Sequence, residues 1–410
     1  MEKIQLALVG CGGMGTRHLY GLGELLKTSF ANVDLVAVCD IRRDSAEMAA
    51  VEAEKITGVR PAVFTDLVTM KQQIPDLVAV DVVVDPSVHH TVVCQALDLG
   101  LHVMVEKPMA ITIKGCHLMM EAAKRNNRIL SVAENFRRDP SARLVNYLLQ
   151  QEAIGRPYMA TFHSLAPHHE VFITPWRHMK DRGGLLLDLG VHFTDMIRYQ
   201  LGDIKEVYGE VKLATPVRKK PDQVNSPYAF YKTRFAEMED AVQATAEDTS
   251  VAMFRMESGV IVNWVVGLGG HGNCDGEVLF GEQGVIQGFG SRGARTHLKK
   301  ADGQELTQEQ ILVTADGFAL EPLAEHFFPE RISGADVDWK LLALEYYELA
   351  AAILDGRKIE VDGMEGMKDI AAVYGIFESS RLGRTVQMSE VESGAVYEYQ
   401  AEIDIALGIV

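Results

Sequence analysis

The sequence is short of positive charge. Of its 410 residues, 40 are lysine or arginine and 57 are aspartate or glutamate, which gives a formal net charge of −17 at pH 7. Proteins that bind nucleic acid use clustered lysine and arginine side chains to displace counterions from phosphates. The only basic cluster in the sequence is Arg218-Lys219-Lys220, which we interpret as a solvated loop. The charge balance therefore argues against a nucleic-acid partner.

Long apolar runs are also absent. No stretch reaches the roughly 18 apolar residues that are needed to cross a bilayer. The chain enters an apolar run at Ile4 without the basic and apolar regions of a secretion signal. We therefore expect a protein that has no membrane partner and stays in the cytoplasm.

Cysteine is scarce. The five cysteines form no Cys-x-x-Cys pair, and none has a histidine at the spacing of zinc ligands. The sequence therefore predicts neither a disulfide framework nor a metal site. We interpret Cys11 and Cys39 as small apolar residues beside the first turn of the chain.

The first third of the chain alternates between two hydrophobic patterns. The length alone predicts roughly two or three domains at about 150 residues per domain. Short apolar, mostly β-branched runs predict strands at Ile4–Val9, Val33–Cys39, Ala62–Phe64, Val80–Val84, Leu101–Val105 and Ile129–Ala133. Amphipathic stretches between them predict helices at Met14–Ser29, Arg43–Thr57, Asp66–Gln73, Val88–Leu99 and Thr112–Asn126. This alternation is typical of parallel strands joined by crossover helices, so residues 1–135 are predicted to form a Rossmann domain with a doubly wound parallel sheet.

Beyond residue 150 the alternation stops. Strand-like runs predict hairpins at Pro157–Ser164, Glu206–Leu213, Thr249–Glu257, Val260–Gly267 and Gly276–Phe280. Helical patterns follow or interrupt them at Gly184–Gln200, Trp339–Leu354 and Met364–Leu382. We expect a second, α+β domain over residues 136–386 with an open, mostly antiparallel sheet that serves substrate binding and oligomerisation. Residues 216–240 read as a polar, turn-rich excursion from that sheet, and residues 387–410 as a tail that could reach a neighbouring subunit.

The first motif with chemical meaning is Gly10-Cys11-Gly12-Gly13-Met14-Gly15, which directly follows the first predicted strand. Glycines at this spacing permit a tight turn and let backbone N–H groups and a helix N-terminus approach a pyrophosphate. Asp40 ends the second predicted strand, where a carboxylate binds the ribose hydroxyls of NAD and repels the 2′-phosphate of NADP. Arg42 could still accommodate that phosphate, so NAD is the expected cofactor and NADP remains possible.

Two further strand ends carry polar residues. Asp85-Pro86 follows the fourth predicted strand, and His90 lies four residues beyond Pro86. Glu106-Lys107-Pro108 follows the fifth strand. Because ligands of open α/β sheets bind beyond the carboxyl ends of the strands, these residues are expected on the nicotinamide side of the cofactor. Lys107 is either a solvated turn charge or a donor to a substrate oxygen.

The third motif is the pair Asp188 and His192. A spacing of four residues puts both side chains on one face of a helix, where a carboxylate can orient an imidazole. Histidine suits the removal of a hydroxyl proton while hydride leaves the same carbon. The alternative is an ordinary pair on a helix surface. The two glycines before the pair and the apolar helix around it favour the functional interpretation.

Taken in order, these motifs resemble those of the glucose–fructose oxidoreductase / inositol dehydrogenase / rhizopine-catabolism (Gfo/Idh/MocA) family. The resemblance covers about residues 4–200 and resumes at 362–386. It implies that Lys107 assists the substrate hydroxyl, that His192 accepts its proton and that Asp188 supports His192. It also implies dimers or tetramers and further residues at the cofactor or beside it, namely Glu106, Asn135, Trp176 and Arg177.

The substrate is less sharply indicated. We expect an NAD(P)-dependent oxidoreductase that acts on a secondary hydroxyl of a sugar, glycoside or cyclic polyol. Two alternatives stay open: a redox-neutral, NAD-dependent glycosidase or epimerase, and a non-catalytic NAD-binding sensor. The polar residues that could line a sugar pocket, or simply form a loop surface, are Arg137, His163, His168, His169, Glu170, Arg177 and His178.

Overall fold

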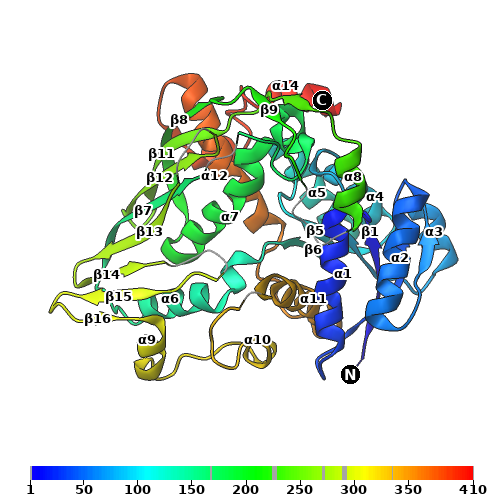
Figure 1. Cartoon of the computed structure of the whole chain (residues 1–410), viewed down its shortest axis with the longest axis horizontal. Coiled ribbons are helices and arrows are strands. Elements are labelled where there is room, and N and C mark those ends of the chain that lie inside the picture. Colours follow the sequence, from blue (N-terminus) through cyan, green and yellow to red (C-terminus); the bar gives the residue numbers. More distant parts are fainter. Residues whose placement is uncertain are drawn as a thin grey trace. The chain divides into compact units, whose positions relative to one another are not determined.

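The chain forms two compact units (Figure 1). The computed structural model describes residues 2–166, 169–223, 229–269, 273–288, 293–334 and 336–409. Unit 1 consists of Met1–Glu134, Pro221–Glu239 and Asp338–Met367, and unit 2 of Asn135–Lys220, Asp240–Val337 and Lys368–Val410. The division made from sequence assigned both later segments of unit 1 to the second domain. Domain boundaries predicted from sequence patterns follow the order of the chain. They cannot reveal that a later segment packs with an earlier domain.

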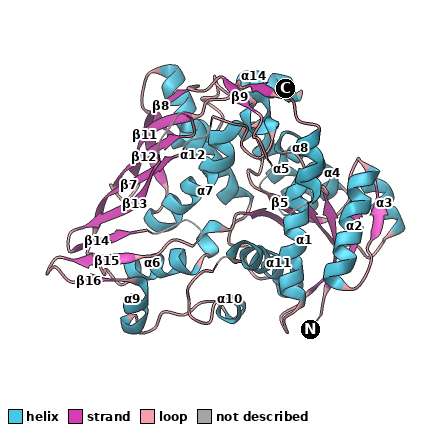
Figure 2. Ribbon diagram, in the orientation of Figure 1, coloured by secondary structure: helices cyan, strands magenta, loops and turns pink. Residues whose placement is uncertain are grey.

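Unit 1 contains a six-stranded, wholly parallel sheet with the strand order β3-β2-β1-β4-β5-β6. Figure 2 draws the strands of the chain in magenta and its helices in cyan. Its strands are β1 (Ile4–Val9), β2 (Val33–Cys39), β3 (Ala62–Phe64), β4 (Ala79–Val82), β5 (His102–Glu106) and β6 (Leu130–Ala133). The helices between them are α1 (Gly13–Leu26), α2 (Arg43–Thr57), α3 (Leu67–Gln73), α4 (His89–Asp98) and α5 (Ile113–Asn126). The predicted Rossmann fold is confirmed. The strand order reverses between β1 and β4, which is where such sheets bind their ligands.

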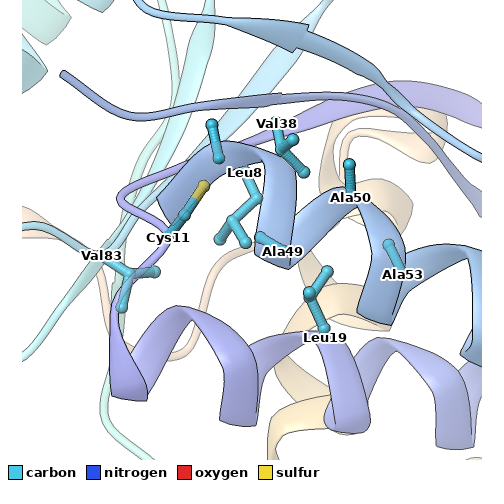
Figure 3. Close-up of a cluster of buried hydrophobic side chains, with 9 residues drawn as sticks. Leu8, Cys11, Leu19, Val38, Ala49, Ala50, Ala53 and Val83 are labelled. Atoms are coloured by element: carbon cyan, nitrogen blue, oxygen red, sulfur yellow. The ribbon is translucent and has the colours of Figure 1, made fainter. Parts of the chain in front are cut away.

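Small side chains hold α1 and α2 against β1 and β2. Figure 3 shows Leu8 and Val38 of the strands in one buried cluster with Leu19 of α1 and with alanines of α2. The alanines let α2 approach the sheet closely. Cys11 belongs to the same cluster and is 2% exposed, so it packs as a small apolar residue. Burial raises the pKa of its thiol.

Unit 2 contains a nine-stranded sheet with the order β16-β15-β14-β13-β7-β12-β11-β8-β17. Its strands are β7 (Pro157–Leu165), β8 (Ile204–Lys212), β11 (Thr249–Met256), β12 (Ile261–Gly267), β13 (Cys274–Gly281), β14 (Gly284–Gln287), β15 (His297–Lys300), β16 (Glu305–Leu306) and β17 (Val386–Gln387). Every pairing is antiparallel except that of β7 with β12. The predicted open, mostly antiparallel sheet is therefore confirmed.

Helix α7 and the part of α12 that belongs to unit 2 contact this sheet. Phe193 of α7 (Gly184–Leu201) lies against Trp264 of β12, with 6.1 Å between the ring centroids. Ser379 of α12 (Gly363–Leu382) accepts a hydrogen bond of 3.1 Å from the backbone N–H of Gly209 on β8. The other α-helices outside the Rossmann sheet are α6 (Pro140–Gln150), α8 (Ala229–Ala236), α9 (Gln308–Thr314), α10 (Pro322–Phe327), α11 (Val337–Asp355), α13 (Met388–Glu392) and α14 (Ala401–Leu407). Within the described ranges, no helix combines the length and the apolar character that spanning a bilayer requires.

The excursion at residues 216–240 has more regular structure than the sequence indicated. It begins at β9 (Val217–Lys219), ends as the chain enters β10 (Ala241–Gln243), and contains helix α8 between these two paired strands. The sequence analysis did not predict this helix, because its few aromatic residues are surrounded by polar ones. The contacts of residues 221–239 group them with unit 1.

The tail packs on its own chain. Tyr399 stacks on Phe377 of α12 at a centroid distance of 4.5 Å, and Ile403 of α14 is buried. Lys180 forms an ion pair with Glu402. The described part of the tail is thus held within unit 2.

The basic run at residue 218 is not a solvated loop, which corrects the interpretation made from sequence. Arg218 lies on β9, is completely buried, and pairs with buried Asp248 at 2.7 Å. Asp248 also accepts hydrogen bonds from the backbone N–H groups of Ala214 and Thr215, each 2.8 Å long. A pattern of charges alone could not show that one of them has a buried partner.

We predict that Asp248→Ala destabilises unit 2 strongly. Removing one partner of a buried pair leaves the other charge without compensation, which costs about 3–5 kcal/mol. Urea unfolding followed by circular dichroism measures this loss. The control is Glu206→Ala, which removes a surface carboxylate that pairs with Arg255 and should lower the free energy of unfolding far less. Equal losses in the two variants would contradict the prediction.

Candidate active site

The glycine-rich turn joins β1 to α1. Gly10 has φ +99°, and a Cβ there would lie 2.4 Å from the carbonyl oxygen of Val83. A Cβ on Gly15 would lie 2.2 Å from the carbonyl oxygen of Gly10. Any side chain at either position would therefore break the turn. No side chain caps the N-terminus of α1, which leaves its first N–H groups for an anion such as a pyrophosphate.

Asp40 lies at the end of β2, beside this turn. Its carboxylate accepts hydrogen bonds from the backbone N–H groups of Cys11 at 2.7 Å and of Arg42 at 2.8 Å. A carboxylate has about four acceptor positions, so it can still bind ribose hydroxyls. The guanidinium of Arg42 is paired with Asp44 at 3.0 Å. Both observations fit NAD better than NADP, whose 2′-phosphate needs a cation at this place.

The ends of β4 and β5 are tied together by a residue that the sequence analysis missed. Buried His89 places one ring nitrogen 3.0 Å from the carbonyl oxygen of Pro108 and the other 3.2 Å from that of Val84. His90, the predicted residue, has its Nε2 atom 3.2 Å from the hydroxyl of Thr91. The side chain of Asp85 caps the short helix of Pro86–Val88 through Ser87. His90 was chosen because of its spacing from Pro86. Spacing alone does not reveal which of the adjacent residues His89 and His90 faces the Glu106-Lys107-Pro108 motif.

A buried charge network holds the residue that precedes Lys107. His18 of α1 contacts Asp81 of β4, with 2.8 Å between Nδ1 and Oδ2, and lies 3.7 Å from Glu106. Tyr346 of α11 donates a hydrogen bond to Asp81. Burial opposes a charge on His18, but Asp81 and Glu106 outweigh it and raise the pKa of His18 to about 10. An imidazolium thus ties Glu106, and with it the Lys107 turn, to α1.

The sequence contains a signal for this network that we did not use. His18 lies at helical spacing from Leu22 and Leu25, on the apolar face of its helix, and Asp81 interrupts an apolar strand. Charged residues at core positions are rarely buried without a partner. A contact between His18 and Asp81 could therefore have been predicted from the sequence.

The network predicts a specific pH dependence of stability. His18 has a folded-state pKa of about 10, above the ordinary value of 6.5, so protonation favours the folded state. This contribution is complete below pH 6.5 and is lost as the pH rises to about 10. The stability of the protein should fall over this window relative to that of His18→Asn, as measured by urea unfolding at several pH values. Parallel curves for the two proteins would contradict the assignment.

In unit 2, Asp188 and His192 lie on α7. Asp188 accepts a hydrogen bond of 2.8 Å from Nε of Arg177, and both side chains are buried. Arg177 also donates to the hydroxyl of Thr174 at 2.6 Å and lies 4.3 Å above the ring of Trp176. Trp176 and Arg177 were predicted at the cofactor, whereas the contact of Arg177 with Asp188 was not predicted from sequence.

An aromatic contact fixes the ring of His192. It stacks on Phe136 with a centroid distance of 4.0 Å and an angle of 8° between the planes. Phe136 begins a short helix, Phe136–Arg138, that precedes α6. A ring held flat against another ring cannot rotate freely, so the position of the imidazole nitrogens is set before a substrate arrives.

The neighbouring predicted residues have different surroundings. Arg137 donates from Nε to both carboxylate oxygens of Asp195, each at 3.0 Å, and both residues are buried, so a contact to substrate is not its main interaction. The side-chain carbonyl oxygen of Asn135 is buried and has no hydrogen-bond partner among the described residues. That oxygen can accept a hydrogen bond from a ligand. The assignment of Asn135 to the cofactor stays a prediction.

The histidine-rich loop is only partly described. His163 lies half-buried on β7, and the backbone of His169 contacts Lys219. Buried His178 accepts a hydrogen bond of 2.9 Å from the N–H of Phe172, so its ring stabilises the loop. His168 lies outside the described residues. Among those residues, no group of three or more His, Cys, Asp or Glu side chains could hold a metal ion.

The fold and these residues define a dinucleotide-binding Rossmann unit joined to a unit that has an open sheet and carries Asp188 and His192 on one helix. Residues 4–134 match the model of an oxidoreductase family with an NAD-binding Rossmann fold, and residues 142–287 match the GFO/IDH/MocA C-terminal domain. Together they cover more than half of the chain. The protein belongs to the GFO/IDH/MocA family of NAD-binding oxidoreductases, as the resemblance implied.

The sequence identity to individual relatives is low. D-apiose dehydrogenase from Paraburkholderia graminis is 24% identical over 399 residues, which are 96% of this chain and 92% of the relative. Glycosyl hydrolase family 109 protein 1 from Akkermansia muciniphila is 30% identical over 162 residues, 38% of this chain and 32% of the relative. A structure of levoglucosan dehydrogenase with NADH and levoglucosan superposes with a TM-score of 0.74 at 21% identity, covering 94% of this chain and 100% of that chain. The last comparison shows that the fold is shared.

Proposed function

We propose that the protein oxidises a secondary hydroxyl of a sugar, glycoside or cyclic polyol and transfers the hydride to NAD. Relatives that bear the names of sugar and polyol dehydrogenases support this substrate class, among them D-apiose dehydrogenase and levoglucosan dehydrogenase. The structural observation that carries the proposal is the fixed position of two side chains on α7. His192 is stacked on Phe136, and Asp188 is anchored by Arg177.

In the proposed mechanism each residue has one role. His192 accepts the hydroxyl proton, and Asp188 favours the protonated imidazole that results. Lys107 polarises the hydroxyl oxygen with its positive charge. The nicotinamide ring, when bound, supplies the carbon that accepts hydride. Gly12, Gly13 and the N-terminus of α1 would hold the pyrophosphate, and the other predicted cofactor residues would line the same site.

The first test uses a panel of substrates. Purified protein is incubated with NAD and with free sugars, inositols and nitrophenyl glycosides, while NADH and nitrophenolate are recorded together. We expect NADH to accumulate with at least one sugar or polyol. A panel that yields neither signal, with a protein that still binds NADH, would contradict the proposal and favour the non-catalytic sensor.

A redox-neutral glycosidase is the second candidate. The local match to a glycosyl hydrolase of family 109 favours it. Such an enzyme would release nitrophenolate without net NADH. The same panel therefore separates the two candidates.

We further propose that NAD is preferred over NADP because of the charge on Asp40. Asp40→Asn keeps an acceptor for the N–H of Cys11 but removes the repulsion of a 2′-phosphate. We expect the ratio of kcat/KM with NADP to that with NAD to rise at least about tenfold, since like charges in contact cost several kcal/mol. Asp34→Asn, which removes an exposed carboxylate from the same strand, is the control and should leave the ratio unchanged. An unchanged ratio in both variants would remove Asp40 as the selecting residue.

The remaining proposals concern the protein's surroundings. We propose a cytoplasmic protein that assembles into a homodimer or homotetramer and has no nucleic-acid partner. Exposed apolar residues on the outer face of β8, β11 and β12 support self-association; they are Tyr208, Val251, Met253 and Ile261. Light scattering of the purified protein gives the oligomeric mass, and Met253→Asp should lower it if this face is the contact.

A further inference from the structure

Helix α8 lies on the glycine-rich turn, although it belongs to the excursion between β9 and β10. The contacts of its residues place it in unit 1, and Figure 1 shows α8, in green, beside α1, in blue. None of the motifs that led to the family includes this helix. Its position therefore calls for an explanation of its own.

Tyr231 occupies the space that a side chain at position 13 would need. A Cβ built on Gly13 would lie 2.1 Å from Cζ and 2.5 Å from the hydroxyl oxygen of Tyr231. A Cβ on Gly12 would lie 3.5 Å from the ring of Phe230. The two glycines and the two aromatic residues of α8 are thus sterically matched, and the hydroxyl of Tyr231 lies against the first turn of α1.

The ring of Tyr231 approaches α1 from the side of the helix. A Cβ projects sideways from a helix, whereas the first N–H groups of a helix point along its axis. Because Tyr231 takes the place of a side chain on Gly13, its ring lies beside the first turn of α1, next to these N–H groups. The hydroxyl is consequently positioned as an additional donor next to the place where the helix N-terminus binds an anion.

The other end of α8 lies near the turn that follows β2. The guanidinium of Arg234 lies 5.2 Å from the centroid of the Phe230 ring. Arg42, through a hydrogen bond, and more weakly Arg234 lower the pKa of Asp44, which places the charge of Arg234 within range of that turn. Helix α8 therefore extends from the glycine-rich turn toward the region of Asp40.

These two turns hold the pyrophosphate and the adenosine ribose of a dinucleotide in Rossmann folds. We propose that α8 forms an additional wall of the NAD site and that Tyr231 binds the pyrophosphate through its hydroxyl. The ligand class is an adenine nucleotide with a pyrophosphate. The inference rests on the binding of NAD by this family and is independent of the substrate that is oxidised.

The test is a fluorescence titration of the full chain with NADH. Tyr231→Phe removes only the hydroxyl and should weaken binding by about ten- to a hundredfold, the range for a hydrogen bond to a charged group. Tyr231→Ala should weaken it at least as much. ADP, which lacks the nicotinamide, should lose affinity by the same factor in a competition experiment. Thr233→Ala changes an exposed residue of the same helix and should leave both affinities unchanged.

A double-variant cycle tests the steric match directly. Gly13→Ala places a methyl group where the Tyr231 ring lies, so the ring has to move and NADH binding should weaken. In the Tyr231→Ala background the same change should add little, because the ring is already absent. Additive losses would show that the two positions do not act together.

Two results would overturn the inference. Tyr231→Phe and Tyr231→Ala that bind NADH as tightly as the wild type would show that the residue makes no contact with the cofactor. Tighter binding would show that α8 obstructs the site. A wild-type protein that fails to bind NADH would contradict the cofactor assignment itself, which the titration of the unaltered chain checks first. Equal melting temperatures of the variants establish that they are folded.

Discussion

His192→Ala is expected to lower kcat by about 10² to 10⁴ while NADH binding stays nearly unchanged. In the proposed mechanism the imidazole accepts the hydroxyl proton and takes no part in holding the dinucleotide. Stacking on Phe136 fixes the ring of His192. A water molecule that replaced the imidazole as proton acceptor in the variant would not be held in the same position. Steady-state kinetics with the best substrate of the panel and a titration with NADH measure the two quantities separately.

Two controls make the His192 result specific. His297→Ala removes an exposed histidine from β15 of the same unit and should leave kcat unchanged. Free imidazole added to the His192→Ala enzyme should restore part of its activity, which it would not do if the substitution had only disturbed the packing of α7. A variant with normal turnover would remove His192 from the mechanism.

Lys107→Met is expected to lower kcat by about 10² to 10³, the usual effect of removing one electrostatic donor from a reacting oxygen. Methionine keeps most of the length of the side chain and removes its charge. The buried contacts of Glu106 with His18 hold the turn in place, so the substitution should leave the fold intact. Kinetics with the same substrate measure the loss.

Lys114→Met is the matched control for Lys107. Lys114 is an exposed lysine on α5 of the same unit, and its loss should not change kcat. If Lys107→Met were as active as this control, Lys107 would be no more than a solvated charge at the end of β5.

The Rossmann unit was predictable because its signals are local. Adjacent residues encode the strand Ile4–Val9, the turn that follows it and the helix after the turn. Gly10 shows the physical reason, since its positive φ and its contact with Val83 exclude any other residue. The second sheet was recognisable as mostly antiparallel from alternating runs, but its order was not.

The missed parts of the site depend on contacts between residues that are far apart in sequence or on a choice between neighbours. The spacing of Asp188 and His192 predicted that they share a helix face, but it could not predict their contacts with Arg177 and Phe136, which lie on two separate short helices. Helix α8 is a comparable case. Its sequence is weakly amphipathic, and its position is explained by a missing side chain at Gly13, some two hundred residues earlier.

The most direct test of the central claim, hydride transfer from a secondary hydroxyl to NAD, follows the hydrogen itself. The best substrate of the panel is prepared with deuterium on the carbon that bears the reacting hydroxyl, and the reduced cofactor is analysed by mass spectrometry. Our account predicts that the reduced cofactor carries the deuterium and forms in equal amount with the oxidised product. Unlabelled or absent reduced cofactor, with the label found in a cleaved product or in solvent, would contradict it.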